Sequence, residues 1–350
     1  MPQTLSAERN ELIATSVEVA PVVRIGRSND VESLFNLAIA GGSGLTNLPP
    51  DRSALAAKLA ASERAIYHDD AREAGAAILL IVEVEDIVVG TSCVFARVGA
   101  EWPFYSYRLT RHTARSQAVA RIQSQGLLNL VNDFDGETEV GGLFIDPAWR
   151  GHALGALAAR ARYLFIAAHR SWFKRRVIAE LRGWQDEAGS PPVWDAIGRH
   201  FYEMEFSEAD RTGALSGNQF IADLGPRYPL YVSMLPEAAR GALGRPHDQG
   251  RLAYEMLIAE GFHAGDYFDI FDGGPTLVAN IDDVHTVRES RNYEVTEIAK
   301  CSGPLALVAT GMGPDFRVGR GKVAAAGTVD SQLAKALDIG TGDQVRVVAA

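Results

Sequence analysis

Cysteine is nearly absent from this 350-residue sequence, which contains only Cys93 and Cys301, far apart in the chain. Neither a Cys-x-x-Cys pair nor a His-x-x-x-His pair occurs, so the spacings that typically hold a structural zinc ion are missing. Two isolated cysteines fit a reducing compartment better than a disulfide-bonded secreted protein. We therefore expect no metal site, and we predict a cytoplasmic protein.

Long apolar runs are absent as well. No segment reaches the roughly 18 consecutive apolar residues of a membrane-spanning helix, so we expect no membrane partner. Glu8, Arg9 and Glu11 precede no apolar segment, which argues against a secretory signal. We expect residues 1–20 to form a loose N-terminal leader. Hydrophobic residues make up 47% of the sequence, so the remainder can bury a substantial core.

Positive charge is scarce overall, and the net charge of the chain is −10. This negative charge argues against nucleic acid as a partner. Residues 108–182 are the exception, with 12 Lys and Arg against 6 Asp and Glu, which leaves 22 − 38 = −16 for the rest. A basic segment in an acidic protein suits a compact polyanion. The alternative is a solvated helix face, and this surface interpretation is favoured for Arg108, Arg111, Arg115 and Arg121.

The segment from Gly141 to Arg170 predicts a strand, a tight turn and a long helix. Leu143-Phe144-Ile145 is an apolar run too short for a helix, and Asp146-Pro147 ends it. The apolar residues that follow recur at intervals of 3, 4, 3 and 4, which is the period of one helix face. They are Leu154, Leu157, Ala161, Leu164 and Ala168.

Charged residues of this helix also enter the prediction. Arg160, Arg162 and Arg170 are expected to extend the helix toward solvent or an anion.

The turn before the helix has the composition of an anion site. The first backbone N–H groups of a helix lack intrahelical partners, and the helix dipole is positive there, so a phosphate is stabilised. Gly151, Ala153 and Gly155 are small enough to let a phosphate approach the backbone. An ordinary amphipathic helix after a capping turn is the alternative.

Other segments predict the surrounding elements. Residues 76–85 and 87–96 form a β-branched hairpin with Gly90 at a bulge. The glycine-rich loop 41–46 either wraps a ligand or ends a helix. Residues 177–181 form a short strand that contains Glu180, and a second half of the chain begins near residue 225.

Several phrases of the sequence together resemble the arginine N-succinyltransferase family, within the GNAT-like acyltransferases. The turn fits the GNAT pattern Arg/Gln-x-x-Gly-x-Gly/Ala through Arg150 and Gly155, but Ala153 replaces the first glycine. The longer phrases occur in the expected order from about residue 22 onward. They are GGSGLTNLPP (41–50), LFIDPAWR (143–150), AELRG (179–183), SPPVWDAIGRHFYEMEFSEAD (190–210) and DYFDIFDGGPTL (266–277).

The resemblance implies an α/β (α+β) chain with a GNAT-like acyl-CoA N-acyltransferase fold. We expect two GNAT-like units and a small C-terminal β unit. The predicted division is a leader at 1–20, a GNAT-like domain with the CoA-binding turn at 21–224, and a GNAT-like half with the terminal β unit at 225–350.

The implied activity is succinyl transfer from succinyl-CoA to the α-amine of L-arginine, which gives N2-succinyl-L-arginine and CoA at the first step of arginine catabolism. Family residues carried over to this sequence are the backbone of Leu143 as a succinyl-CoA site and His247, in Gly244-Arg245-Pro246-His247, as proton donor. The remaining residues expected to bind the co-substrate are Phe144, Ile145, Arg150, Gly151 and Gly155.

An arginine substrate requires carboxylates that face its guanidinium group. Glu180 and Asp272 are the substrate-binding candidates, and Asp186 and Asp269 are further ones. The alternative role of Asp272 is to shape its turn. The sequence leaves two alternative functions open. The protein acylates another amino acid such as ornithine, or it is a catalytically weak partner subunit, a role that Ala153 in the CoA turn would fit. We expect a homo-oligomer or a pair with a homologous subunit.

Overall fold

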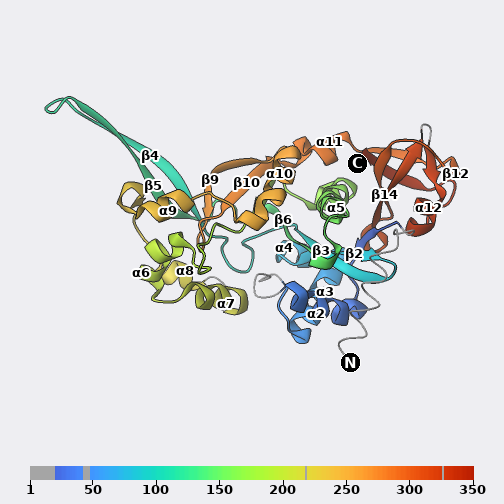
Figure 1. Cartoon of the computed structure of the whole chain (residues 1–350), viewed down its shortest axis with the longest axis horizontal. Helices are drawn as coiled ribbons and strands as arrows, with labels where there is room; N and C mark the ends of the chain where they lie inside the picture. The colour runs from blue at the N-terminus through green and yellow to red at the C-terminus, as the bar shows by residue number, and fades with distance from the viewer. Residues whose placement is uncertain (1–19, 42–47, 217–218, 325–326) are drawn as a thin grey trace.

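The computed structural model describes residues 20–41, 48–216, 219–324 and 327–350, so the predicted leader and most of the glycine-rich loop 41–46 lie outside the described residues. The chain is elongated and of mixed α/β class (Figure 1). Its strands form one 16-stranded sheet in the order β11-β16-β13-β14-β1-β2-β3-β6-β7-β10-β9-β4-β5-β8, with β12 and β15 off this path.

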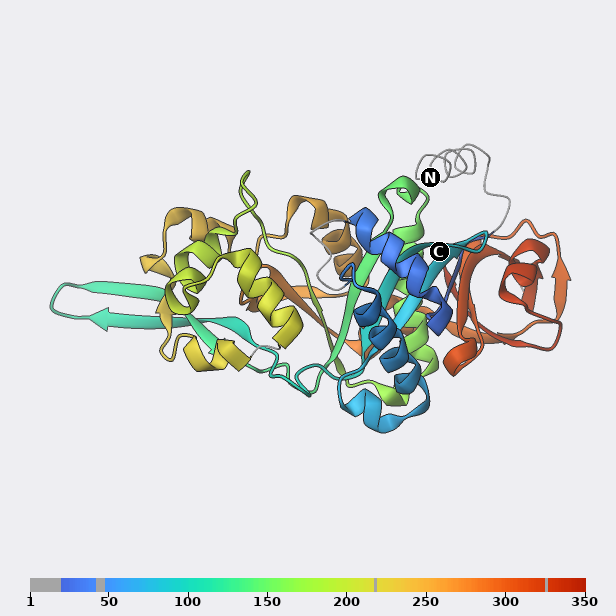
Figure 2. The same ribbon diagram turned by 90° about the horizontal axis from the view of Figure 1, so that it is seen from below.

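The central part of the sheet is covered by helices on both faces. In the view from below, α2 and α3 lie in front of the central strands and α5 lies behind them (Figure 2). The central strands are β1 (Val22–Ile25), β2 (Ala77–Val84), β3 (Ile87–Phe95), β6 (Thr138–Ile145), β7 (Arg176–Glu180), β10 (Pro275–Asn280) and β9 (His263–Asp269). The helices are α2 (Val31–Gly41), α3 (Arg52–Tyr67), α4 (Asp69–Glu73) and α5 (Leu154–Ala168).

Burial on both faces explains why β2 reads as a continuous apolar run. Ile78 and Leu80 pack in the core beneath α5, while Leu79 and Ile81 pack against α2 and α3. The predicted hairpin is confirmed as β2 and β3. Glu85 and Asp86 form its two-residue turn, and both have positive φ.

The predicted bulge in this hairpin is confirmed. The register between β2 and β3 shifts between Val82, which pairs with Gly90, and Glu83, which pairs with Val88.

One end of the molecule carries a helical cap and a projecting ribbon. Its elements are β4 (Ser106–Ser116), β5 (Arg121–Val131), η5 (Trp194–Gly198), α6 (Arg199–Tyr202), α7 (Phe206–Ser216), α8 (Gln219–Leu224), β8 (Leu230–Tyr231), α9 (Glu237–Ala242) and η7 (Asp248–Gly250). Trp194 and Tyr107 are buried in the second core at this end. The next helix along the chain, α10 (Arg251–Ala259), lies nearer the middle of the molecule, where its Leu257 packs in the same core as α5 (Figure 1). The strands β4 and β5 were missing from the sequence prediction.

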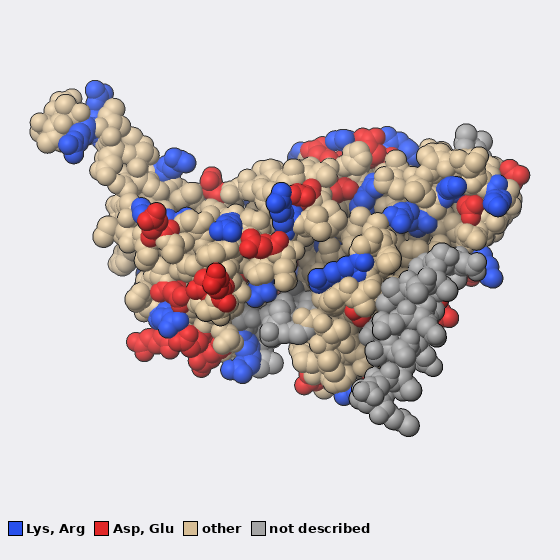
Figure 3. All heavy atoms as spheres, in the orientation of Figure 1, with Lys and Arg blue, Asp and Glu red and all other residues tan. Residues whose placement is uncertain are grey.

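The ribbon formed by β4 and β5 extends into solvent (Figures 1 and 3). Arg108, Arg111, Arg115 and Arg121 are exposed on it, which confirms the surface interpretation, although they lie on strands and not on a helix.

The opposite end is a small β unit. It consists of β11 (Arg291–Glu294), β12 (Glu297–Ala299), β13 (Leu305–Thr310), β14 (Arg317–Ala324), β15 (Thr328–Asp330), α12 (Ser331–Leu337) and β16 (Gln344–Ala349). Its β14 pairs with β1, from the first part of the chain, so the unit continues the central sheet. The helix α11 (His285–Glu289) precedes the unit and packs against α5. The expectation of two GNAT-like units, divided near residue 225, stays a prediction.

The arginines of α5 are arranged differently from the prediction. The helix ends at Ala168, and Arg170 forms an ion pair with Asp282, with 2.6 Å between Nε and Oδ1. Arg160 pairs with Glu260, the C-cap of α10, at 3.1 Å, and its Nε also donates to the hydroxyl of Thr286 in α11 at 2.8 Å. Arg162 is buried. The expectation that all three point toward solvent or a bound anion is therefore wrong.

Ala153 shows why a glycine is usual at its position. It is the N-cap of α5 and has the left-handed conformation, with φ of 57° and ψ of 18°. In this conformation the Cβ atom of an L-residue is crowded, which costs about 1–2 kcal/mol, whereas glycine has no such penalty.

We predict that Ala153→Gly raises the free energy of unfolding by about 1 kcal/mol, because it removes this strain. Chemical denaturation measures the change. The matched control is Ala156→Gly, the same substitution at an exposed helical position of α5, where glycine lowers stability by up to about 1 kcal/mol. Equal losses in both variants would contradict the strain at Ala153.

His169 joins the end of α5 to the C-terminal β unit. Its Nδ1–H donates to the Phe165 carbonyl at 3.0 Å, and its Nε2 accepts from the Gly313 N–H at 2.9 Å. The ring packs between Phe165 and Trp172, each with ring centroids 4.2 Å away. Burial lowers the pKa of His169. The neutral ring is thus the form that makes both bonds.

We predict that the protein loses stability as the pH falls below about 6.5, the pKa of an unfolded histidine. Below that pH the unfolded chain binds a proton that the folded chain excludes, so the unfolded state gains relative stability. Thermal unfolding across this range measures the slope. His169→Gln should flatten it, and the control His263→Gln, at an exposed site on β9, should not. Identical slopes in all three proteins would contradict the prediction.

Candidate functional site

The strands β6 and β7 pair over a very short distance. They are parallel, and their register joins Thr138 to Val177 and Glu139 to Ile178. Beyond Glu139, β6 continues to Ile145 beside β3, while β7 continues beside β10. The edge of β6 from Val140 onward therefore has no strand neighbour on the β7 side within the described part of the chain. The carbonyl groups of Gly141 and Gly142 accept hydrogen bonds from the side chains of Arg162 and Thr91, at 3.4 and 3.2 Å. The edge beyond them is available to an extended ligand.

A bulge lies in β6 at the point where the strands separate. The register against β3 shifts between Gly141, which pairs with Cys93, and Phe144, which pairs with Thr91. Gly142 has φ of 57°, and a Cβ atom there would lie 2.7 Å from the sulfur of Cys93. Only glycine fits both constraints. The signal in the sequence was the glycine pair inside a strand.

The predicted strand residues follow this bulge. Leu143 packs against the core beneath α5, Phe144 packs against the core beneath α2 and α3, and Ile145 is buried. Their side chains are thus occupied by the core. Any contact with a ligand between the strands must involve their backbone, as was expected of Leu143.

The turn after β6 leads directly to the N-terminus of α5. The side chain of Asp146 accepts the Ala148 N–H at 2.9 Å and caps the short helix Pro147–Trp149. Arg150 and Gly151 follow and are exposed, and Gly151 has φ of 89°. A Cβ atom on Gly155 would meet nothing within 4 Å. The structure therefore brings the predicted strand and turn residues together around an open helix N-terminus.

Four carboxyl groups influence one another near the end of β7. Burial raises the pKa of Glu180 well above its usual value, and the charges of Asp269, Glu139 and Asp272 raise it further. Its Oε1 accepts a hydrogen bond from the hydroxyl of Thr276 at 3.3 Å. Burial and then Asp272 raise the pKa of Asp269 in the same way. This cluster is short of positive charge and favours a cationic ligand.

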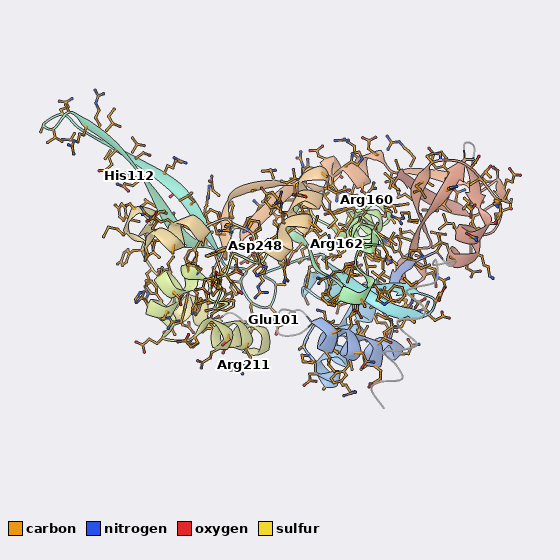
Figure 4. All side chains as sticks on the ribbon, in the orientation of Figure 1. Glu101, His112, Arg160, Arg162, Arg211 and Asp248 are labelled. Atoms are coloured by element: carbon orange, nitrogen blue, oxygen red, sulfur yellow. The ribbon has the colours of Figure 1, made fainter. Side chains whose placement is uncertain are left out.

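Glu139 is the carboxyl group that the sequence interpretation missed. It lies in the paired part of β6, opposite Ile178. Burial raises its pKa to about 7, against the lowering effect of Arg162 and Lys58. Figure 4 labels Arg162 on α5. The available signal was a single acidic residue inside the strand Thr138–Ile145.

The other acidic candidates have turn contacts. Asp272 is buried and its Oδ1 accepts the Gly274 N–H at 2.9 Å. Asp269 accepts the N–H groups of Phe271 and Asp272, both at 2.8 Å. Asp186 accepts two N–H groups of its own turn, from Ala188 and Ser190, at 2.9 Å each. Asp186 is exposed, so it is the weakest of these candidates.

The loop of His247 is tied to the residues that follow β7. The His247 N–H donates to the Arg182 carbonyl at 2.8 Å, and the Trp184 N–H donates to the Arg245 carbonyl at 2.9 Å. Gly183 forms a β-bridge with Pro246 between them. A Cβ atom on Gly183 would lie 2.4 Å from the Asp272 carbonyl oxygen, so glycine permits this close packing. Figure 4 labels Asp248, the residue after His247.

The contacts of His247 define which ring nitrogen carries the proton. Its Nδ1 accepts the Gln249 N–H at 3.2 Å, which places the proton of the neutral ring on Nε2. Burial and the charge of Arg182 lower the pKa of His247, while Asp248 and Asp272 oppose the shift. Asp272 acts electrostatically on both His247 and Glu180. The structure therefore brings Glu180, Asp272 and His247 together at the carboxyl end of β7.

Within the described residues, no group of three or more His, Cys, Asp or Glu side chains has the arrangement of a metal site. Likewise, no helix in that part of the chain is long and apolar enough to cross a membrane.

Comparison with known proteins gives the same family over nearly the whole chain. The family described as "Arginine N-succinyltransferase beta subunit" matches residues 21–286, and the family of its C-terminal domain matches residues 291–349. The arginine N-succinyltransferase of Yersinia pestis is 37% identical over 350 residues, which span 95% of this chain and 97% of that protein.

Two comparisons with Pseudomonas aeruginosa agree. A relative named "Arginine N-succinyltransferase subunit beta" is 38% identical and covers 93% of this chain and 97% of its own length. The solved structure of arginine/ornithine succinyltransferase subunit AI superposes with a TM-score of 0.84 at 31% identity, covering 95% of this chain and 99% of that one.

The parallel pair β6–β7, the helix that follows β6 and the solved structure of the succinyltransferase subunit agree on the predicted mixed α/β fold, and its GNAT-like character stays a prediction. This chain belongs to the arginine N-succinyltransferase beta subunit family.

Proposed function

We propose that this protein transfers the succinyl group of succinyl-CoA to the α-amine of L-arginine, giving N2-succinyl-L-arginine and CoA, the first step of arginine catabolism. The observation that carries the proposal is the separation of β6 from β7, with an open helix N-terminus on one side and the carboxyl groups with His247 on the other. Family membership supports the same reaction.

The co-substrate is held by backbone groups. The pantetheine arm of succinyl-CoA lies along the unpaired edge of β6 and bonds the main chain of Leu143, Phe144 and Ile145. Its pyrophosphate lies at Arg150, Gly151 and Gly155, where unpaired N–H groups and the dipole of α5 stabilise negative charge. This arrangement orients the thioester without a resident cofactor.

Bond formation requires two proton movements. The α-amine attacks the thioester carbon, a C–N bond forms, and the C–S bond then breaks. The amine loses one proton and the thiolate of CoA gains one. His247 donates the proton from Nε2, since its Nδ1 is occupied by the Gln249 N–H. Glu139 is the base of suitable strength, because its pKa of about 7 keeps a useful fraction ionised at neutral pH.

The acceptor is selected by charge. Burial raises the pKa of Glu180, and the negative charges of Asp269 and Asp272 raise it further when the site is empty of cations. The guanidinium group of arginine is planar and permanently charged, and it can bond two carboxyl oxygens at once. Its binding relieves the repulsion and restores the charged form of Glu180.

We predict that L-arginine is succinylated with a kcat/KM about 100-fold or more above that of citrulline, which has nearly the same shape but no charge. A cluster of buried acids left without a cation loses several kcal/mol of interaction. CoA thiol release from succinyl-CoA, measured for arginine, ornithine, citrulline and a no-amine control, tests this. Thiol release at the no-amine rate for every amine would refute the proposed activity.

The same measurement decides between acceptors. Ornithine remains an alternative, because the related solved structure is named for both amino acids. A higher kcat/KM for ornithine than for arginine would keep the reaction and change the substrate.

We further predict that His247→Asn lowers kcat about 100-fold at unchanged affinity for CoA, because a general acid typically contributes at least that factor. Asparagine keeps an acceptor for the Gln249 N–H and therefore preserves the turn. His247→Ala removes both functions and serves as the comparison for stability. A kcat of His247→Asn within twofold of the wild type would exclude His247 as the proton donor.

Assembly and location complete the proposal. We infer that the protein is cytoplasmic, where acyl-CoA donors are available, and that it works as a homo-oligomer or with a homologous subunit. A catalytically weak partner subunit is the alternative role, and the strained Ala153 at the CoA turn is the feature in its favour.

A further inference from the structure

The ribbon of β4 and β5 extends well beyond the strands of the body that pair with it. We call residues 110–127 the arm. At its base β4 pairs with β9 over Ser106 to Arg108, and β5 pairs with β8 at Leu127 and Leu128. Beyond these pairs the two strands contact only each other in the sheet, through the register from Thr110–Leu127 to Ser116–Arg121.

Few contacts stabilise the arm when the chain is alone. Seven residues of each strand span roughly 20 Å at the usual rise per residue. A two-stranded ribbon alone in water is marginally stable, and its two edges expose unpaired backbone groups. Val119 and Ile122, near the tip, are 63% and 67% exposed. A long exposed ribbon with an apolar tip has the features of an interaction surface.

The charge of the arm is of one sign. Residues 110–127 include Arg111, Arg115 and Arg121 and no Asp or Glu, whereas the whole chain has a net charge of −10. All three arginines are exposed, and none has a carboxylate partner among the described residues. The arm is thus a cationic projection of an acidic protein (Figure 3).

The opposite charge gathers on the helical cap of the same end. Residues 195–224, which form η5 and α6 to α8, include six Asp or Glu against two Arg, a balance of 2 − 6 = −4. We call this segment the acidic cap. Arg199 forms ion pairs with both Asp195 and Glu205, which leaves a net charge of −1 among the three. Glu203 and Glu208 are exposed and have no basic partner in the described structure. Figure 3 shows this acidic surface below the base of the arm.

An arm cannot reach the acidic cap of its own chain, because it projects away from the body (Figure 1). We propose that the arm of each chain docks on the acidic cap of a second copy. A twofold pairing satisfies both arms and both caps at once, since each copy then offers the same two surfaces. Two arms of 18 residues and two caps also supply the 20–30 residues a side that a stable interface of standard size requires.

The test uses the purified full-length chain in sedimentation equilibrium. We expect a dimer at low salt that weakens in about 1 M salt, where the screening length falls to about 3 Å. The variant Arg111→Glu/Arg115→Glu/Arg121→Glu should raise the dimer Kd at least tenfold. Replacement of residues 111–126 by Asn-Gly, which joins the paired residues Thr110 and Leu127 by a two-residue turn, should abolish the dimer.

The matched control is Arg64→Glu/Lys300→Glu/Lys335→Glu, which changes the net charge equally at exposed sites outside the arm and should leave the Kd unchanged. The variant Glu203→Arg/Glu208→Arg should restore association when it is mixed with the variant Arg111→Glu/Arg115→Glu/Arg121→Glu. A monomeric wild type at low salt, or equal weakening in the control, would overturn the proposal. Binding of a labelled RNA by a monomeric wild type, lost in the triple arginine variant, would also overturn it, because the arm would then bind nucleic acid and not a second copy. Because the readout is mass, the result is independent of whether the proposed reaction occurs.

Discussion

The short pairing of β6 with β7 is the constraint on which the rest of the site depends. Two residue pairs hold the strands parallel, and then β6 remains with β3 while β7 joins β10. The separation leaves backbone groups of β6 unpaired in the middle of a large sheet, where such groups are normally satisfied. A ligand with its own amide groups can replace the missing strand. The bulge at Gly142 and the turn before α5 direct both ends of that ligand.

The same separation determines where charge can accumulate. Glu180 ends β7, next to the turns that carry Asp269 and Asp272, and the loop of His247 is bonded to the residues that follow Glu180. A buried cluster of acids destabilises a folded protein unless a cation compensates it. Its presence at the opening between two strands is therefore better explained by the binding of a cationic substrate than by stability.

The two ends of the molecule have different roles in this arrangement. The C-terminal unit extends the central sheet through β14, and His169 bonds it to the end of α5, so it stabilises the helix to which we assign co-substrate binding. The other end carries the acidic cap and the arm, whose opposite charges belong to surfaces that one chain cannot join. The proposed catalytic site and the proposed docking surfaces thus occupy separate parts of one continuous sheet.

The sequence by itself determined the strand, turn and helix at residues 143–168, the hairpin before them and the family, because local periodicity, turn residues and long specific phrases are all written along the chain. It could not show that Arg160 and Arg170 pair with Glu260 and Asp282, or that Glu139 lies in the site, because those partners are distant in sequence. Only the tertiary structure placed His247 beside the end of β7, since backbone bonds between loops depend on packing and not on local pattern.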